Sequence, residues 1–566
     1  MDKLTERIIT CDVLIVGGGI AGLMAAIKAS DFDVNVVVVD KQNIERSGCA
    51  GVGCDHFQVY IPEIHGPSID PYLGIGDLED EDIVRTIWTE SSKILKLWED
   101  FGIPVKPRGE FEFVGHRKPG YPGFMIKYEG QNQKRILMKE AQKREIEVIN
   151  RVMVHELLVN NGRIAGAVGV STREPEVYVF LAKSIFLGNA YNLIERLYPS
   201  IVGGTLFNTD NNPSNTGDGQ ISAYRAGAEV TGAEFIRRHR GVRYFCRCGQ
   251  GTWIGIITDA YGNEFIPPYL GKPNRITGPP LLTQEAAESV WKSGRGPIYL
   301  DGRGMPEDDL QYMMWGLMNE GNSALVDYMR SEGIDLRTTR IEWGMYGYKS
   351  QLHVRVTSKC ETTIPGLYCE YPRHDIAATS AERKWAPTFM ADITAAAVSG
   401  WIGGEEAAKY ARSTELTDIE IIRKQIDGTK QMYHEILNRK APYIKWQDAN
   451  IALNQIMIDY AGDIRAETTL RAGLKHIKRF KNKFARFAYA ENMHELMRCL
   501  EVLNLFDIAE LTFIAMAERK ESRGYHFRID FPKPNPQLAK LLIMKKANGQ
   551  ITLRWENPRR IKGGMC

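Results

Sequence analysis

The strongest constraint on the fold is residues 11–40, which read CDVLIVGGGIAGLMAAIKASDFDVNVVVVD. Two apolar runs flank a glycine turn and a stretch with helical spacing, so this segment predicts strand, turn, helix and strand. Gly17, Gly19 and Gly22 form a GxGxxG pattern, in which missing side chains let backbone N–H groups approach an anion at the helix start. Asp40 ends the second strand, where a carboxylate can accept hydrogen bonds from ribose hydroxyls. The segment predicts dinucleotide binding and leaves open whether the nucleotide is FAD or NAD.

Length and composition describe an ordinary globular protein of several units. The chain has 566 residues, which favours three or four structural units. Hydrophobic residues make up 43% and charged residues 25%, so disordered, fibrous and disulfide-scaffold classes are excluded. The 72 basic and 70 acidic side chains leave a net charge of +2, which gives no global sign of a nucleic-acid or membrane-surface partner.

The cysteines favour a reducing compartment and no metal site on this chain. Nine cysteines are scattered along the sequence without a repeated CxxC pattern, which zinc sites and cubane iron–sulfur clusters usually need. We therefore expect any iron–sulfur cluster to sit on another chain. No apolar run reaches about 18 residues, so we expect no membrane span, no signal peptide and a cytoplasmic location.

Several motifs further along the chain resemble one flavoprotein family. They are IERSGCAGVG at 44–53, VHELLVNNGRIAGAVGVS at 154–171, NTGDG at 215–219, CETTIPGLY at 360–368 and ESRGYHFRIDFP at 521–532. In order and spacing they resemble the flavoprotein subunits of fumarate reductase, succinate dehydrogenase, L-aspartate oxidase and adenylylsulfate reductase. The resemblance implies FAD as the cofactor and an iron–sulfur electron-transfer subunit as the partner.

Within this family, the phrase RSG at 46–48 and the stretch EGQNQKRILMKEA at 129–141 are most similar to adenylylsulfate reductase. Gly48 stands where fumarate reductases with covalent flavin have a histidine, which implies non-covalent FAD. Cys49 could be a thioether anchor or a redox thiol, but we favour a small buried cysteine beside the cofactor. The expected cofactor-binding residues are Gly17, Gly19, Gly22, Asp40, Lys41, Ser47, Gly48, Cys49, Asp218 and Glu370.

The resemblance implies an α/β fold with an additional α-helical part. We expect a discontinuous, Rossmann-like FAD-binding domain at 1–235 and 340–402, interrupted by an α+β capping domain at 236–339. Apolar residues at three- and four-residue spacing predict long helices after it, in a helical domain at 403–520. A C-terminal tail follows at 521–566. We interpret ESRGYHFRIDFP in this tail mainly as a structural clasp between the helical and FAD-binding domains.

A concentrated cationic segment follows Glu234. No acidic residue occurs between Glu234 and Asp259, whereas arginines and a histidine crowd positions 237–247. Arginine offers a planar donor fork that suits carboxylate, sulfate or phosphate, so the segment favours an anionic substrate over a solvated loop. AEFIRRHRG resembles the family segment that carries a substrate-binding histidine. The resemblance makes His239 the first candidate, with Arg237 and Arg240 beside it.

The expected second half of the active site departs from the dicarboxylate enzymes of the family. No HxMGG phrase precedes CETTIPGLY; the chain reads KSQLHVRVTSK, in which His353 and Arg355 alternate on one side of a strand. Pro280 stands near the place of the proton-donating arginine of fumarate reductases and cannot deliver a proton. Arg373 and His374 stand near the expected meeting point of flavin and substrate. We take His353 and Arg355 as substrate-binding candidates; for His353 and Arg373 the alternative is a paired polar residue at a domain interface.

A second basic run, GLKHIKRFKNKFARF at 473–487, is compatible with a helix and contains no acid. Such a run is usually a solvated face, and the alternative is a docking surface for an acidic electron-transfer protein.

Together these features favour an FAD-dependent oxidoreductase subunit. It would exchange electrons between an anionic small molecule and an iron–sulfur partner, in a reaction like that of adenylylsulfate reductase or fumarate reductase. The alternatives are a non-catalytic electron-relay flavoprotein and an oxygen-using oxidase like L-aspartate oxidase.

Overall fold

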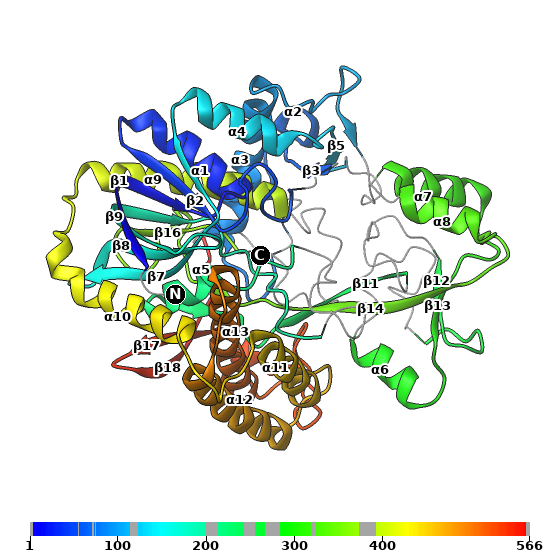
Figure 1. Cartoon of the computed structure of the whole chain (residues 1–566). Helices are drawn as coiled ribbons and strands as arrows, with labels where there is room; N and C mark the ends of the chain where they lie inside the picture. The colour runs from blue at the N-terminus through cyan, green and yellow to red at the C-terminus, as the bar shows by residue number, and fades with distance from the viewer. Residues whose placement is uncertain are drawn as a thin grey trace.

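The computed structural model describes residues 4–51, 53–54, 56–70, 73, 75–113, 123–199, 212–242, 255–265, 284–319, 323–372 and 392–561. Its main body is a large sheet with helices on both faces, and a smaller sheet with α6, α7 and α8 extends to the right of it in Figure 1. The mixture of helices and sheets confirms the expected fold class.

The largest sheet has seven strands in the order β6-β2-β1-β9-β8-β7, with β16 pairing β9 off this path. Neighbours among β6, β2, β1, β9 and β16 are parallel, whereas β7, β8 and β9 pair antiparallel. The strands are β1 (Thr5–Val16), β2 (Val36–Asp40), β6 (Glu147–Asn150), β7 (Val152–Asn160), β8 (Arg163–Ser171), β9 (Glu176–Leu187) and β16 (Leu367–Cys369).

The predicted strand, turn, helix and strand at residues 11–40 are confirmed. β1 and β2 are parallel, with Val13 opposite Val36, and α1 (Ile20–Ala29) connects them. Every residue of β2 is buried, as expected for a parallel strand covered on both faces. α9 (Asp392–Arg412) packs against α1 and β9, while α5 (Asp218–Arg225) and α13 (Met493–Glu518) contact β7 and β8.

The predicted hairpin at 154–171 is also confirmed. β7 and β8 pair antiparallel, with Asn160 opposite Arg163. The two residues between them, Asn161 and Gly162, have φ values of 49° and 78°. Positive φ at both turn positions matches the right-handed twist of the flanking strands, so the turn fixes their register.

A second hydrophobic core forms under the smaller sheet, whose strand order is β11-β14-β13-β12. Its strands are β11 (Ile236–Val242), β12 (Ile256–Thr258), β13 (Ile298–Asp301) and β14 (Ile341–Ser350), and its helices are α6 (Gln284–Lys292), α7 (Glu307–Asn319) and α8 (Ser323–Ser331). Its buried core residues run from Val242 to Trp343. The exact limits of the capping domain remain a prediction.

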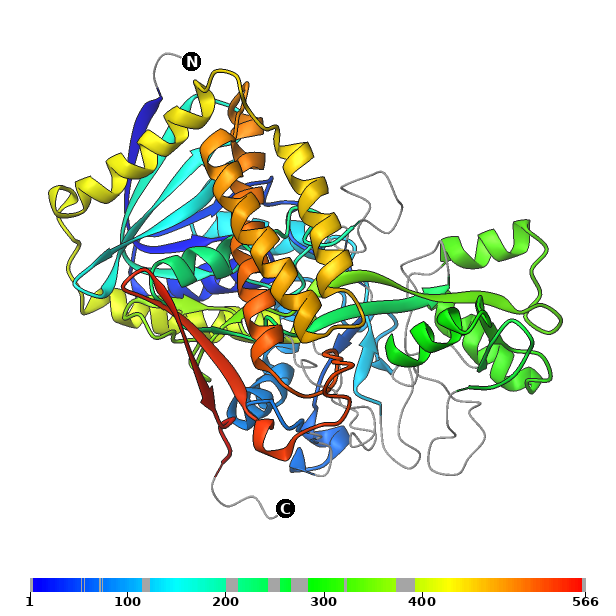
Figure 2. The same cartoon turned by 90° about the horizontal axis from the view of Figure 1, so that it is seen from below.

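Long helices follow the large sheet, as the apolar spacing predicts. They are α10 (Ile419–Leu437), α11 (Trp446–Ala461), α12 (Glu467–Phe487) and α13. α12 packs against both α11 and α13, and Figure 2 shows this group of yellow and orange helices beside the sheet. No helix of the described residues is long and apolar enough to cross a membrane.

The chain ends in a hairpin of β17 (Leu541–Ala547) and β18 (Gln550–Glu556), which pairs with β10 (Val230–Thr231) and β15 (His353–Val354). The segment before it joins distant parts of the fold. Arg523 pairs with Asp77 at 2.5 Å, and Arg528 pairs with Glu467 at 3.2 Å at the start of α12. These contacts agree with the predicted clasp.

The remaining elements lie around α1. A three-stranded sheet in the order β3-β5-β4 is flanked by three helices. Their bounds are β3 (His56–Gln58), β4 (Glu112–Phe113), β5 (Met125–Lys127), α2 (Pro62–His65), α3 (Glu81–Asp100) and α4 (Gln133–Lys143).

Candidate functional site

The turn between β1 and α1 is a tight loop that only glycine permits. A Cβ on Gly22 would overlap the carbonyl oxygen of Gly17, and Gly17 itself has a φ of +94°. The first turn of α1 therefore lies directly against the end of β1. Gly19 is the N-cap of α1 and has no side-chain cap, so the N–H groups of the first turn are left for another acceptor.

Further glycines surround this loop. A Cβ on Gly19 would meet one atom within 4 Å, the Gly188 carbonyl oxygen at 3.7 Å, whereas a Cβ on Gly48 would lie 3.2 Å from the Cα of Gly19. We call Gly17, Gly18, Gly19, Gly22, Gly48 and Gly188 the glycine cradle. Its uncapped helix start and missing side chains suit close approach of an anion such as a pyrophosphate.

Asp40, at the end of β2, accepts hydrogen bonds from the cradle and the loop beside it. Its Oδ2 accepts hydrogen bonds from the Gly18 N–H at 2.6 Å and the Ser47 hydroxyl at 2.9 Å. Lys134 of α4 donates to the carbonyl oxygen of Gly18, and burial lowers the pKa of this lysine to about 8. The predicted residues Asp40, Ser47 and Gly48 are thus brought together at the start of α1.

Lys41 and Asp218 belong to a buried ion cluster next to the cradle. Lys41 Nζ donates to Asp218 at 2.6 Å and to Glu501 of α13 at 2.9 Å. Arg196 and Arg498 also pair with Glu501, at 2.5 and 2.8 Å. We call these five residues the Lys41 cluster.

The three cations and two acids of the Lys41 cluster stabilise one another's charged forms. Burial alone would raise the pKa of Glu501, but Lys41, Arg196 and Arg498 outweigh it and hold that pKa far below its usual range. Burial would lower the pKa of Lys41, and Asp218 and Glu501 raise it instead. Lys41 and Glu501 are therefore both charged at neutral pH.

Glu370 has the opposite environment. Its side chain is buried, and its Oε1 accepts a hydrogen bond from the Ala190 N–H at 2.9 Å. Burial raises the pKa of Glu370 to about 8. Among the described residues no cation forms an ion pair with it. Asn189, which precedes Ala190 in the sequence, is half-buried; its side-chain oxygen lacks a hydrogen-bond partner and lies close to Gly219 of α5.

The expectation that Cys49 is buried is wrong. Its side chain is exposed, yet desolvation by surrounding protein raises the pKa of its thiol to about 12. Glu195, Lys349 and Glu370 act electrostatically on this thiol, so Cys49 lies between the cradle and the cationic segment.

The cationic segment contributes a pair of buried cations to the smaller sheet. Arg237 of β11 lies opposite Lys349 of β14, and both side chains are buried. Residues directly opposite in an antiparallel pair share one face of the sheet. Glu195 lies 3.6 Å from Lys349. This face therefore combines two buried cations with one acid.

The neighbouring Arg238 is used differently. Its guanidinium pairs with Asp463 and stacks 4.3 Å over the ring of Tyr348. It therefore links β11 and β14 to the turn between α11 and α12.

Two other candidates have structural partners. His353 is buried, with Nδ1 2.9 Å from the carbonyl oxygen of Gln351. Arg355 pairs with Asp80 and with Glu556 at 2.8 Å, which joins the start of α3 to β18. The catalytic role expected of Arg355 remains a prediction, although its guanidinium is already held by two carboxylates.

Other predicted positions cannot be placed. His239 and Arg240 belong to β11, opposite Tyr346 and Met345, but their side chains lie outside those that the structure describes. Pro280, Arg373 and His374 also lie outside the described residues.

The residues present fit a dinucleotide. The cradle would hold a pyrophosphate through backbone N–H groups, and the Asp40 carboxylate stands at the end of β2 where a ribose lies in such folds. Sequence reasoning missed Lys134, Glu195, Lys349 and Glu501. Lys134 and Lys349 lie inside quoted motifs, but Glu501 is 460 positions from Lys41 and carries no local signal.

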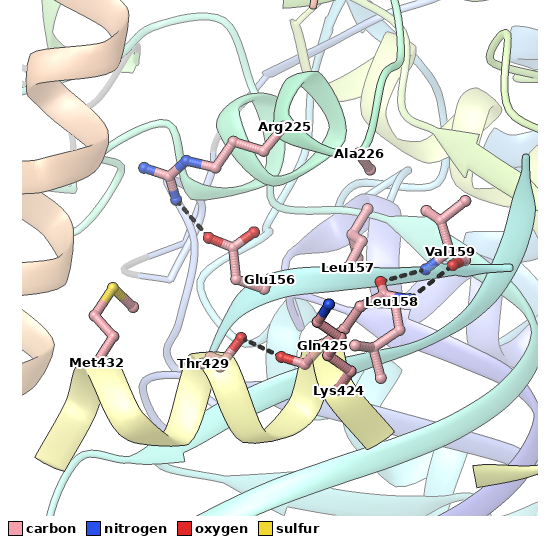
Figure 3. A pocket seen from close by; sticks show the side chains of 11 residues that line it. Glu156, Leu157, Leu158, Val159, Arg225, Ala226, Lys424, Gln425, Thr429 and Met432 are labelled. Carbon is pink, nitrogen blue, oxygen red and sulfur yellow. Dashed lines mark hydrogen bonds and ion pairs between the residues drawn. The ribbon is translucent and has the colours of Figure 1, made fainter. Parts of the chain in front are cut away.

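A separate pocket of about 450 Å³ lies between β7, α5 and α10, and none of the predicted site residues lines it. Figure 3 shows Arg225 and Glu156 paired at one end, at 3.1 Å, and Gln425 of α10 bonded to the backbone of Val159. In the described residues no group of three or more histidine, cysteine, aspartate or glutamate side chains is placed to hold a metal ion.

Comparisons with known proteins agree with this geometry. Residues 12–369 match the family model described as "FAD binding domain", and residues 450–560 match "Fumarate reductase flavoprotein C-term". The chain is 23% identical to a fumarate reductase (CoM/CoB) subunit of Methanothermobacter marburgensis, covering 96% of this chain and 98% of that protein. It is 24% identical to L-aspartate oxidase of Streptomyces coelicolor, covering 96% and 93%.

Among solved structures, the fold resembles adenylylsulfate reductase of Archaeoglobus fulgidus, with a TM-score of 0.79 and 20% identity over 99% of this chain and 97% of that one. FAD as the cofactor and the predicted family resemblance are confirmed by these matches.

Proposed function

The chain belongs to the family of FAD-binding flavoproteins that includes the fumarate reductase subunits, and on this premise we propose its place in an electron-transfer reaction. It is an FAD-dependent oxidoreductase of that family. The proposed function is to exchange electrons between an anionic small molecule and an iron–sulfur partner protein. Bound FAD would supply the two-electron chemistry, and the chain's own residues bind, orient and neutralise charge.

The cofactor part of the proposal rests on the glycine cradle. The N–H groups at the uncapped start of α1, beginning at Gly19, would bind the pyrophosphate, and Asp40 would accept hydrogen bonds from the ribose. Ser47 and Glu370 would complete the lining of the cofactor site beside the cradle. Non-covalent binding is supported by Gly48 and by the raised pKa of the Cys49 thiol, because a protonated thiol is a poor nucleophile.

The observation that carries the anionic substrate is the opposed pair Arg237 and Lys349. Both side chains are buried, Lys349 lies 3.6 Å from Glu195, and guanidinium and ammonium groups suit a bound carboxylate, sulfate or phosphate group. His239 and Arg240 on the same strand are proposed to complete the site. His353 would then orient backbone groups near β10, and Arg355 would position the start of α3 through Asp80.

A substrate like adenylylsulfate and one like fumarate would both satisfy this charge requirement. The two named relatives also have different activities in their names: one is a fumarate reductase subunit and the other an L-aspartate oxidase. Substrates of all three kinds carry negative charge, so the shared chemistry is an anion beside the flavin. The cytoplasmic location stays a prediction from the cysteine pattern.

The test is anaerobic reduction of the FAD-loaded chain by light, followed by a panel of anionic acceptors: fumarate, other enoates, adenylylsulfate and sulfite. We expect at least one acceptor to reoxidise the flavin, and Arg237→Gln to slow that reaction. Flavin that no acceptor reoxidises would contradict the proposal and favour a relay subunit. Rapid reoxidation in air without a partner would favour an oxidase.

A further inference from the structure

The outer face of α12 carries a straight row of cations. Lys475, Arg479, Lys483 and Arg486 are all exposed, and they are spaced by four, four and three positions. Residues three and four apart lie on one side of a helix, so the row runs along a single face. At 1.5 Å per residue it is about 16 Å long. We call these four residues the α12 stripe.

The stripe lacks the counter-charges found on other surface helices. On α4, Lys143 and Arg144 pair with Glu140; on α9, Lys409 pairs with Glu405 and Glu406. α12 has such a pair only in its first turn, where Arg471 contacts Glu467 at 2.6 Å. No aspartate or glutamate occurs from Thr468 to Phe487.

Acids on the neighbouring helix do not neutralise the stripe either. Lys481 pairs with Asp507 and Glu510 of α13, and Lys478 lies 3.7 Å from Glu510. In the described part of the chain, no carboxylate forms an ion pair with any stripe residue. Helix phase thus divides one basic run in two, an inner pair bound to α13 and an outer stripe that faces solvent.

The stripe is held rigidly. Leu470, Gly473, Ile477 and Phe484 form the buried face of α12, and the helix packs against α11 and α13. In Figure 1 the helix lies at the lower edge of the molecule, beyond α13. A partner would therefore meet a preformed row of charges.

The far end of the stripe lies at the same level along α13 as Glu501 of the Lys41 cluster. Contacts between Lys478 and Glu510 and between Lys481 and Asp507 show that α12 and α13 are antiparallel. This register places Arg486 near residue 502 of α13, next to Glu501. A partner docked on the outer face of α12 would therefore have α12 and α13 between it and the Lys41 cluster, roughly 20 Å at about 10 Å per helix.

We propose that the α12 stripe is the docking surface for an acidic electron-transfer protein; this inference rests on the proposed function and names a surface for its partner. Net charge does not explain the stripe, since the whole chain carries only +2. A lipid surface is disfavoured, because none of the large exposed apolar side chains of the described residues lies on α12. Unpaired surface cations chiefly speed the encounter with an acidic partner.

The test uses the full FAD-loaded chain and a reduced plant-type ferredoxin, a small acidic iron–sulfur protein. Two reduced ferredoxins would each give one electron, and with protons from solvent these reduce one FAD. The variants are the reversal K475E/R479E/K483E/R486E and the milder K475Q/R479Q/K483Q/R486Q. The matched control reverses four exposed lysines on other elements, K424E/K440E/K520E/K533E, which changes the net charge by the same amount.

We expect the reversal to slow flavin reduction about tenfold or more at low salt and to flatten its salt dependence, with a smaller loss for the glutamine variant. The control should change the rate by less than about threefold. Equal rates in all variants, equal loss in the control, or no reduction of wild-type FAD by ferredoxin would overturn the proposal. Retention of the wild type by anionic vesicles or duplex DNA but not by immobilised ferredoxin would also overturn it.

FAD binding and chemical reduction by dithionite are measured in the same samples. If the chain binds no FAD, the proposed function itself fails. If it binds FAD that dithionite reduces, but the stripe variants behave like wild type, only the docking surface fails.

Discussion

The Lys41 cluster and the glycine cradle are neighbours, but the buried carboxyl groups beside them have pKa values shifted in opposite directions. In the cluster, Glu501 is surrounded by Lys41, Arg196 and Arg498, and these cations lower the pKa of its carboxyl. On the cradle side, Glu370 is equally buried, but its described partner is one backbone N–H, and its pKa is raised to about 8. The cluster satisfies its own charges, whereas the cradle side leaves backbone and a carboxyl group incompletely partnered.

This difference shows which region needs a ligand. The charges of the cluster already have partners within it, and its ion pairs join the end of β2 to α5 and α13. A region with an uncapped helix start and missing side chains gains from a ligand that fills it. We therefore propose that the cofactor binds at the cradle, and that Lys41 and Asp218 support the residues next to it.

The largest expected effect comes from breaking the cluster. Glu501→Gln would leave three buried cations with Asp218 as their remaining acid, and removal of one partner from a buried ion network costs about 3–5 kcal/mol. The urea midpoint of unfolding should fall accordingly. Glu518→Gln, at an exposed position of the same helix, should change the free energy of unfolding by less than about 0.5 kcal/mol and leave the midpoint almost unchanged. Equal midpoints for the two variants would mean that the cluster is not a structural joint.

A pH titration compares the two carboxyls directly. The folded pKa of Glu370, about 8, lies above its usual value of 4.5, so the folded state binds the extra proton between these values. Stability should therefore fall as pH rises through this window, by a few kcal/mol in total.

Glu370→Gln should remove that fall. The measurement is the difference in urea midpoint between wild type and variant, without FAD, from pH 5 to pH 8. A difference that does not change with pH would show that Glu370 is not held protonated.

Gly22→Ala tests the close contact inside the cradle. Its Cβ would overlap the Gly17 carbonyl oxygen, so the loop must shift, and overpacking of this kind costs about 1–3 kcal/mol. We expect a lower thermal midpoint together with loss of FAD. A variant that keeps both its midpoint and its flavin would refute the description of this turn.

Gly19→Ala tests the open part of the cradle and should have the smallest effect on stability. A Cβ there meets only the Gly188 carbonyl oxygen, at 3.7 Å, so the chain without FAD should fold as wild type does. The added methyl would occupy space needed by the pyrophosphate, and FAD affinity should fall about tenfold, or about 1.4 kcal/mol. Titration of FAD into the two proteins measures this. Unchanged affinity would place the pyrophosphate elsewhere.

The cradle could be predicted from the sequence because its residues interact locally. Gly17, Gly22 and Asp40 lie within 24 positions, and the alternation of apolar runs and helical spacing fixes how they meet. The α12 run is recognisable for the same reason. Its division into inner and outer cations is not, because that depends on how the helix is rotated against α13.

Residues joined only by the tertiary fold escape prediction. Glu501 reaches Lys41 across 460 positions, and Asp80, the acid that pairs with Arg355, is 275 positions away from it. Burial is the natural expectation for Cys49 because cysteine side chains usually are buried, whereas this side chain is exposed and follows the left-handed Gly48. The neighbouring residues in the sequence indicate neither the long-range ion pairs nor the exposure of Cys49.

The most direct test of the account is the cofactor released by the purified chain on acid denaturation. We predict one FAD per chain in the supernatant, none attached to the precipitated protein, and a higher thermal midpoint when FAD is added to flavin-free chain. No flavin even after refolding with FAD, or flavin that stays attached to the polypeptide, would contradict it.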